Sequence, residues 1–408
     1  MAINAPEGTR DLLPDEALFW NQFKQTAAEV FGAYGYLPIE TPIMEQTELF
    51  VRGIGEATDV VSKEMFTAIS GENLRRWVEE GKAPKAKSRL SLRPEGTAGV
   101  VRAVVENNLV PQGSTPFKAY YAEAMFRGER PQKGRLRQFH QVGIEWLGAP
   151  DPAADAECII MLMEFYKRLG FDLSKLRLLI NSMGDAQCRP AYREQVKQFI
   201  LDHADEMCDE CRERAELNPL RAFDCKNDHC REIMAEAPLM GDNLCDECRE
   251  HYEQVKRYLD AAGIEYVEDP TLVRGLDYYT RTVFEVEAPG AGVGSIGGGG
   301  RYDDMVGKFL GTQVPAVGFS IGFERVCGIL LEQGYQIPGA KQKIALLYGK
   351  DADFPAVLSK AAALRDTYNV TVLQQAKKLG KQLGQLEAAG FAGAAFMDKD
   401  EVKIFAQQ

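Results

Sequence analysis

Hydrophobic residues in the first part of the chain follow helical and extended patterns in turn. Apolar residues recur every three or four positions over residues 14–32, which predicts a helix with one buried face. Residues 37–43 contain two prolines, as is typical of an extended edge segment. Residues 117–126 and 138–147 alternate polar and apolar side chains. We therefore expect an antiparallel hairpin whose strands are joined by the basic loop 127–137.

The middle of the chain mixes helical, strand-like and glycine-rich segments. Residues 151–171 show helical spacing, and about 185–263 are mostly helical, charged and rich in cysteine. Further expectations are an exposed polar excursion at 73–88, a helix at 96–108, a strand at 274–286, a glycine-rich turn at 290–300, a buried strand at 314–322 and a helix at 323–332.

The pattern changes after residue 343. Strand-like and helix-like segments alternate between residues 344 and 396, in the order strand, helix, strand, helix, strand. This order predicts a small α/β unit with a largely parallel sheet, and residues 334–343 are its linker.

Length and charge limit the classes of protein to which the chain can belong. At 408 residues the chain exceeds the size of one hydrophobic core, so two or three domains are expected. No apolar run is long enough to span a bilayer, and the first residues lack the parts of a signal peptide, so we expect a cytoplasmic protein. The net charge of −12 does not indicate an RNA partner, although RNA binding depends on local basic patches rather than on the total.

The candidate chemistry begins with phosphate binding. No Gly-x-x-x-x-Gly-Lys-Ser/Thr run occurs, which excludes a P-loop. A dinucleotide-type glycine pattern at 292–297 is followed by no helical pattern that would direct a helix N-terminus at a pyrophosphate. Arginines are better candidates, because a guanidinium is always charged and forks onto phosphate oxygens. Phe126-Arg127-Gly128-Glu129 lies in the hairpin, and Gly322-Phe323-Glu324-Arg325 precedes a helix.

These two runs are similar to motifs 2 and 3 of class II aminoacyl-tRNA synthetases. Further runs resemble one family of that class, the histidyl-tRNA synthetases. They are Leu92-Arg93-Pro94-Glu95-Gly96-Thr97, the longer motif 2 run 127–141, Arg274-Gly275-Leu276-Asp277-Tyr278-Tyr279, and Gly299-Gly300-Arg301-Tyr302-Asp303. The matches follow the order that the family has.

The resemblance implies a fold, an activity and partners. The fold is an α+β class II catalytic domain, an antiparallel sheet flanked by helices, at residues 1–184 and 265–333. A mostly helical insertion domain occupies 185–264, and a shortened C-terminal α/β anticodon-binding domain occupies 344–408. Such an enzyme is a homodimer that pairs through its motif 1 region, here 35–64. It activates histidine with ATP and Mg²⁺ and transfers the histidine to tRNA(His).

The resemblance also implies an amino-acid pocket. Its members are Glu95, Thr97, Gln141, Glu145, Tyr278 and Tyr279. Glu95 and Thr97 would accept the α-ammonium group of histidine. Glu145 and Tyr279 would bind the imidazole ring, because a neutral imidazole offers one donor and one acceptor.

Four arginines complete the implied site. Arg127 would hold the α-phosphate beside the bound histidine, and Arg135 and Arg325 would hold the departing pyrophosphate. Arg274 would lie next to the histidine carboxylate and stabilise the charge that develops at phosphorus. The alternative for Arg274 is an ion pair with Asp277. The histidine carboxylate itself attacks, so positioning and charge stabilisation, with Arg127 and Arg274 as the catalytic residues, carry the reaction.

The cysteines form a second candidate site. Cys208-Asp209-Glu210-Cys211 and Cys245-Asp246-Glu247-Cys248 are Cys-x-x-Cys knuckles, with Cys225 and Cys230 between them. Four thiolates from two knuckles suit one tetrahedral structural zinc ion. The 33 residues between the knuckles exceed the usual ribbon spacing. Buried thiols and redox-labile pairs are the alternatives to a zinc site at Cys208, Cys211, Cys245 and Cys248.

Two other kinds of protein share parts of this pattern. Regulatory subunits of ATP phosphoribosyltransferase have the same catalytic-domain fold, bind no tRNA and typically lack the C-terminal domain. Here Arg127, Arg135, Arg274 and Arg325 occur together and a C-terminal unit is present. A class II synthetase for threonine or proline would not carry the run Arg274–Tyr279.

Overall fold

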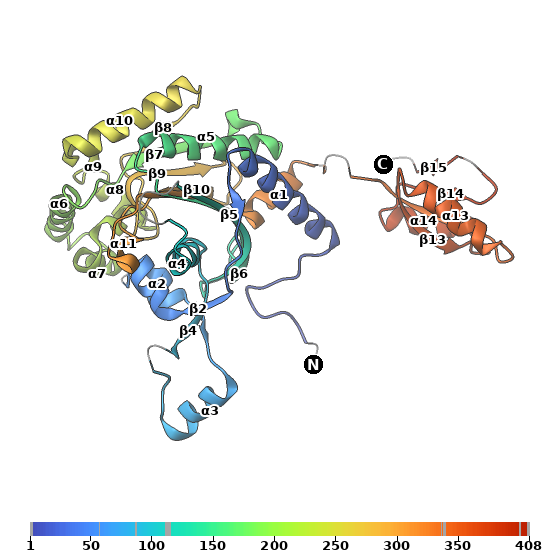
Figure 1. Ribbon diagram of the computed structural model, residues 1–408, viewed down its shortest axis with the longest axis horizontal. Coiled ribbons are helices and arrows are strands. Elements are labelled where there is room, and N and C mark those ends of the chain that lie inside the picture. Colours follow the sequence, from blue (N-terminus) through green and yellow to red (C-terminus); the bar gives the residue numbers. More distant parts are fainter. Residues whose placement is uncertain are drawn as a thin grey trace. The chain divides into compact units, whose positions relative to one another are not determined.

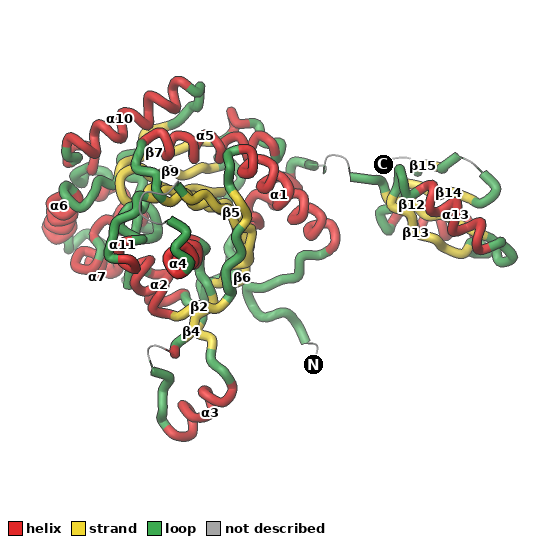
Figure 2. The backbone as a smooth tube through the Cα atoms, in the orientation of Figure 1, coloured by secondary structure: helices red, strands yellow, loops and turns green. Residues whose placement is uncertain are grey.

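The chain divides into two compact units, Met1–Tyr335 and Gln336–Gln408. A computed structural model describes residues 3–56, 58–85, 88–110, 116–335, 337, 340–399 and 401–405 (Figures 1 and 2). The boundary between the units falls in the segment predicted to be a linker, part of which lies outside the described residues. Among the described helices, none combines the length and the apolar character that a membrane span requires.

An eight-stranded sheet organises the first unit, in the order β1-β5-β6-β11-β10-β9-β7-β8. Its central strands are antiparallel, whereas β1 pairs in parallel with β5 at one edge and β8 with β7 at the other. The strands are β1 (Leu37–Pro38), β5 (Phe117–Phe126), β6 (Gln138–Leu147), β7 (Arg177–Ser182), β8 (Val267–Glu268), β9 (Thr280–Glu287), β10 (Ser295–Arg301) and β11 (Ala316–Gly322). The predicted β5–β6 hairpin and the edge strand β1 are confirmed.

Helices α1 (Pro14–Ala33), α5 (Pro152–Arg168) and α12 (Phe323–Glu332) pack together on one face of this sheet. Their aromatic side chains interlock: the ring centroids of Phe23 and Phe165 lie 5.1 Å apart, and those of Phe23 and Phe323 lie 5.4 Å apart. Helix α4 (Thr97–Glu106) lies on the opposite face, inside the curve of the sheet (Figure 1). The helices predicted at these four places are confirmed.

The glycine-rich segment corrects one expectation. Residues 290–294 do form a turn, and Gly290, Gly292 and Gly294 have positive φ angles of 85°, 68° and 67°. Gly297–Gly300, however, belong to the buried strand β10 rather than to the turn. A Cβ atom on Gly299 would collide with the carbonyl oxygen of Gly318 on β11. These glycines therefore permit close packing in the middle of a sheet.

Short helices make up the residues that the sequence predicts as an insertion. They are α6 (Arg189–Asp202), α7 (Asp209–Leu217), the 3₁₀ helix η4 (Pro219–Asp224), α8 (Asp228–Met234), α9 (Met240–Asn243) and α10 (Asp246–Ala261). All of them belong to the first compact unit. Helix α10 packs against α5, where a hydrogen bond of 2.7 Å joins His251 Nε2 and Asp155 Oδ2.

A second, three-stranded sheet has the order β2-β4-β3 and supports the polar excursion. Its strands are β2 (Met44–Gln46), β3 (Thr67–Ala68) and β4 (Leu90–Leu92), and the excursion between β3 and β4 contains an unexpected helix, α3 (Gly71–Glu80). None of the α3 residues is buried. Residues 86 and 87 of the excursion lie outside the described part. Further helices of the unit, within the described residues, are α2 (Thr47–Ile54), the π-helix η1 (Val60–Glu64), the 3₁₀ helix η3 (Leu173–Lys175) and α11 (Gly307–Leu310).

The second unit is the predicted α/β sheet, in the order β13-β12-β14-β15. Its elements are β12 (Lys343–Tyr348), α13 (Phe354–Leu364), β13 (Asn369–Gln374), α14 (Leu379–Ala388), β14 (Gly393–Phe396) and β15 (Lys403–Ile404). The first three strands are parallel, and β15 is antiparallel to β14. The side chains of α13 and α14 enter two separate apolar clusters, which follow alternate residues of β12.

Candidate active site

A cavity of about 770 Å³ opens over the face of the large sheet that carries α4. Strands β6, β9, β10 and β11, the loop of the β5–β6 hairpin and the start of α4 all contribute to its wall. Every residue that the sequence analysis assigned to histidine or ATP lines it: Glu95, Thr97, Arg127, Arg135, Gln141, Glu145, Arg274, Tyr278, Tyr279 and Arg325. The structure thus brings together residues that are up to 230 positions apart in the sequence.

Glu145 lies at the buried end of this cavity. Its carboxylate accepts hydrogen bonds from Thr97 Oγ1 (2.7 Å) and from the hydroxyl of Tyr302. Burial raises the pKa of Glu145 to about 8, although both hydroxyls act in the opposite direction. Each carboxylate oxygen keeps a further lone pair, so Glu145 can also accept a hydrogen bond from a ligand N–H group.

Glycines make room for this carboxylate and its neighbours. Gly318 on β11 stands directly opposite Glu145 on β6, and a Cβ atom there would collide with the Glu145 carboxylate. Cβ atoms at Gly96 and Gly143 would both collide with the ring of Tyr121. The small residues around the pocket are therefore required by its shape.

The start of α4 fixes Glu95 and Thr97. The Glu95 carboxylate accepts hydrogen bonds from the backbone amides of Thr97 and Ala98, both at 2.8 Å. Burial raises the pKa of Glu95, and these amides lower it. A carboxylate at a helix N-terminus is favoured by the exposed amides and the helix dipole. Glu95 is consequently held in one orientation at the cavity wall.

The predicted phosphate-binding arginines form a basic group near the hairpin loop. Arg127 Nε donates to the carbonyl of Pro94 (2.9 Å), and its guanidinium lies 5.2 Å from the ring centroid of Phe139. Arg325 Nε donates to the carbonyl of Gly134 (3.0 Å) in the loop. Burial lowers the pKa of Arg325, and the charge of Arg135 lowers it further. Two guanidinium groups that repel each other at a cavity wall provide a site for an anion.

Arg274 is anchored differently from the sequence-based alternative. It forms an ion pair with Glu285 on β9, whereas Asp277 accepts a hydrogen bond from Asn218 (2.6 Å). Burial lowers the pKa of Arg274, but the carboxylate of Glu285 and the hydroxyls of Tyr279 and Tyr278 together outweigh it, and the net shift is upward. Gly298 on β10 gives the guanidinium space, because a Cβ atom there would lie 3.0 Å from Arg274 Nη1. The charge of Arg274 is therefore permanent and its position is fixed.

Two buried polar atoms of the cavity residues have no hydrogen-bond partner within the described part of the chain. They are Oε1 of Gln141 and Nε of Arg274. Buried polar groups in proteins are almost always paired. An acceptor and a donor that remain unpaired in one cavity are features expected of a site that binds a polar ligand.

Three residues of the site received no role from the sequence. Tyr302 binds Glu145, Glu285 binds Arg274, and Tyr121 fills the space between two glycines. Tyr302 lies within the quoted run 299–303, and Glu285 is a charged residue among the apolar positions of β9. The positions of Tyr302 and Glu285 in the sequence indicate that both side chains have unusual surroundings. Only the folded structure shows that Tyr302 contacts Glu145 and that Glu285 contacts Arg274.

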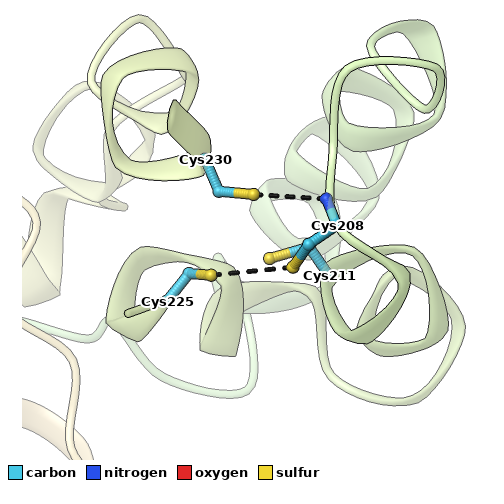
Figure 3. A group of neighbouring side chains, drawn as sticks. All are labelled: Cys208, Cys211, Cys225 and Cys230. Atoms are coloured by element: carbon cyan, nitrogen blue, oxygen red, sulfur yellow. Dashed lines mark hydrogen bonds between the residues drawn. The ribbon is translucent and has the colours of Figure 1, made fainter. Parts of the chain in front are cut away.

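The cysteines are not grouped as the sequence analysis predicted. The two knuckles lie at the N-termini of different helices, α7 and α10, and belong to different clusters. Cys208 and Cys211 gather with Cys225 and Cys230 (Figure 3). Cys245 and Cys248 gather with Asp185 and Cys188 instead. The prediction of one site made from both knuckles is therefore wrong, because each knuckle lies next to other cysteines, or to a cysteine and an aspartate, and not next to the other knuckle.

Comparisons with known proteins agree with this geometry. The family model described as "Histidyl-tRNA synthetase" matches residues 8–326. The chain belongs to the histidyl-tRNA synthetase family. The histidine–tRNA ligase of Moorella thermoacetica is 47% identical over 359 residues, which cover 87% of this chain and 81% of the relative. The histidine–tRNA ligase of Anaeromyxobacter sp. (strain K) is 40% identical over 98% of this chain and 93% of its own length.

Solved structures lead to the same fold. The apo histidyl-tRNA synthetase of S. aureus superposes with a TM-score of 0.71 at 32% identity, covering 97% of this chain and 91% of that one. A Bacillus halodurans protein described as "ATP phosphoribosyltransferase regulatory subunit/histidyl-tRNA synthetase" has a TM-score of 0.66 at 20% identity, with 97% and 98% covered. The second likeness concerns the fold alone. The class II synthetase fold expected from the sequence is confirmed.

Proposed function

We propose that the cavity is where this chain works as a histidine–tRNA ligase. It activates L-histidine with ATP to histidyl-adenylate and pyrophosphate, and then transfers the histidine to the 3′ end of tRNA(His). The observation that carries this proposal is the convergence of all ten predicted residues on one cavity in a member of the family. A regulatory subunit, which charges no tRNA, would not need the four arginines.

Histidine fits the buried end of the cavity. Its imidazole ring lies between Glu145 and Tyr279, with Gln141 and Tyr278 at its sides. The rings of Tyr278 and Tyr279 are 4.6 Å apart between centroids and form a continuous aromatic wall. The α-ammonium group is bound by Glu95, whose orientation the α4 amides fix, and by Thr97.

ATP occupies the basic part of the cavity, with Mg²⁺ as part of the substrate, as is general in this class. Arg127 binds the α-phosphate, and Arg135 and Arg325 bind the leaving pyrophosphate. Arg274 lies beside the histidine carboxylate, which attacks the α-phosphate. Its positive charge faces the oxygens on which negative charge increases in the transition state, so it lowers the barrier without acting as an acid, base or nucleophile.

The other parts of the chain bind tRNA. The helical residues 185–264 clamp the acceptor arm beside the cavity, and the unit at 344–408 binds the anticodon. Such charging takes place in the cytoplasm.

The test is to incubate the purified chain with ATP, histidine and a tRNA(His) transcript, and histidyl-tRNA should accumulate until most of the transcript is charged. A chain that formed adenylate but charged no tRNA(His) would contradict the transfer step.

We further propose that the chain is a homodimer that pairs through the motif 1 region at 35–64. Strand β1 lies at the edge of the large sheet, and Leu37 and Ile43 are 69% and 50% exposed in the single chain, whereas Ile39 is packed against its own core. An exposed apolar edge of this kind favours association.

Light scattering should report a dimer at micromolar concentration. A glutamate in place of Leu37 or Ile43 places a charge in the apolar contact, so it should raise the dissociation constant at least ~10-fold. Leu201→Glu is the matched control, because Leu201 is also exposed but lies on α6. A wild-type monomer, or equal effects of all three substitutions, would refute this interface.

A further inference from the structure

The cysteine-rich part of the chain contains two four-ligand clusters that the proposed reaction does not use. The distal cluster consists of Cys208, Cys211, Cys225 and Cys230 (Figure 3). The basal cluster consists of Asp185, Cys188, Cys245 and Cys248. Within each cluster the ligand atoms all lie within 4.8 Å of one another.

The distances within the clusters match those around a tetrahedral ion. Two thiolates at about 2.3 Å from one zinc ion stand about 3.8 Å apart. The sulfur atoms of Cys208 and Cys225 are separated by 3.8 Å, and those of Cys188 and Cys248 by 3.9 Å. The Asp185 carboxylate oxygen lies 3.6 Å from the sulfur of Cys188 and 3.9 Å from that of Cys245.

Disulfides and iron–sulfur clusters do not fit these distances. A disulfide requires its sulfur atoms about 2.05 Å apart, and all nine cysteines are free. An iron–sulfur cluster places several iron atoms between its four cysteines, which would hold the sulfur atoms farther apart than 4.8 Å. One small ion per cluster is the arrangement that the geometry supports.

Backbone amides prepare the sulfur atoms for an ion. The amide of Cys208 donates to Cys230 Sγ (3.2 Å), and that of Asn227 donates to Cys225 Sγ (3.5 Å). In the basal cluster, the amide of Asp185 donates to Cys188 Sγ (3.4 Å). Such hydrogen bonds favour thiolates and orient metal ligands. Most of the ligands are buried, and only Cys208, Cys245 and Asp185 are partly exposed.

The basal cluster joins the two ends of the insertion. Asp185 and Cys188 follow strand β7, where the chain leaves the large sheet, and Cys245 and Cys248 begin α10, with which it returns. Arg281 Nη2 lies 3.4 Å from Asp185 Oδ2, and Arg281 directly follows Thr280 at the start of β9. An ion here would fasten the insertion to the strand that carries Glu285, the partner of Arg274.

The distal cluster lies among helices that are too short to be stable alone. Helix α7 has nine residues, η4 six and α8 seven, and isolated helices of such length are marginal in water. A bound ion commonly stabilises a region whose helices are this short.

We propose that the chain binds two structural zinc ions, one in the distal cluster and one in the basal cluster. Four protein ligands close each site, so neither ion has an open position for substrate. Thiolate-rich tetrahedral sites select zinc among the divalent ions available to a reducing compartment. The basal site follows a sequence signal that is easily missed: Asp185-Ala186-Gln187-Cys188 has the spacing of a knuckle with aspartate in its first position.

Elemental analysis of the full chain, purified without a histidine tag, should give about two zinc ions per chain. Cys225→Ser and Cys248→Ser should each retain one zinc ion, and the double variant none. Cys327→Ala is the matched control, since Cys327 is buried in α12 outside both clusters, and it should retain two. Two ions retained by Cys225→Ser, or no zinc bound by the wild-type chain after reconstitution under reducing conditions, would overturn the proposal.

Two further measurements keep the test valid if a serine variant folds poorly. Asp185→Cys preserves a ligand, so this variant should still bind two ions, and with cobalt in place of zinc its sulfur-to-metal absorption should exceed that of the wild type.

Hydrogen exchange should quicken in α7 and α8 when Cys225 is replaced, and near residues 183–189 and 245–252 when Cys248 is replaced. Uniform quickening in both variants, or an unchanged cobalt spectrum for Asp185→Cys, would contradict two separate sites.

Discussion

Arg274→His is expected to lower the turnover of histidyl-adenylate formation by ~10²–10³, the usual loss when one preorganised charge-stabilising donor is removed. Arg274 is held by Glu285, its charge is permanent, and its Nε atom is buried without a partner within the described chain. Histidine at this position would be shorter and mostly neutral at pH 7.5. Single-turnover kinetics should show turnover falling much further than the Michaelis constants for histidine and ATP rise.

The comparison needs a control arginine whose glutamate partner lies on the same strand, β9. Arg177 on β7 pairs with Glu287 of β9 across the sheet, outside the cavity, so Arg177→His removes a similar ion pair and should leave turnover nearly unchanged. Transfer of histidine from preformed adenylate should suffer less than adenylation in Arg274→His. A variant whose sole defect was weaker histidine binding would reduce Arg274 to a residue that positions the substrate.

The regular parts of the fold could be predicted because local patterns determine them. Burial alternates along most of Phe117–Phe126, and the predicted bounds of Phe117–Phe126 and Gln138–Leu147 are those of the structure. Helix α3 was missed because most of its residues are polar: Leu74, Trp77 and Val78 recur at helical spacing, but they are few and stay exposed. Gly297–Gly300 were predicted as a turn because glycine is typical of turns, whereas the fold uses them where neighbouring strands leave no space for a Cβ atom.

The site shows the same division between local and long-range information. Residues that belong to recognisable runs, such as Glu95, Arg127 and Arg274, could be identified from the sequence. Their partners could not be identified in this way. Glu285, for example, lies on the strand that follows Arg274 in the sequence, and only the folded structure shows that the two side chains form an ion pair. The cysteines were assigned to the wrong groups for the same reason. Spacing reveals a knuckle, but the packing of α7 and α10 decides which other side chains gather around it.

Selectivity for histidine is the other large effect that the site predicts. Another amino acid in the buried end of the cavity would leave the carboxylate of Glu145 and the amide of Gln141 without the partners that an imidazole supplies. Polar sites of this kind reject ligands that leave their groups unpaired by up to ~10⁴–10⁵ in kcat/KM. Glu145→Gln keeps the shape and replaces one carboxyl oxygen with an NH₂ group that can only donate, so it should lower kcat/KM for histidine by ~10–10² and reduce the preference for histidine over other amino acids.

ATP–pyrophosphate exchange, measured with each of the twenty amino acids in turn, tests the central claim most directly. The wild-type chain should exchange pyrophosphate rapidly with histidine and only at background rates with the other nineteen, including the similarly sized glutamine and phenylalanine. Faster exchange with any amino acid other than histidine would contradict the assignment of the cavity to histidine.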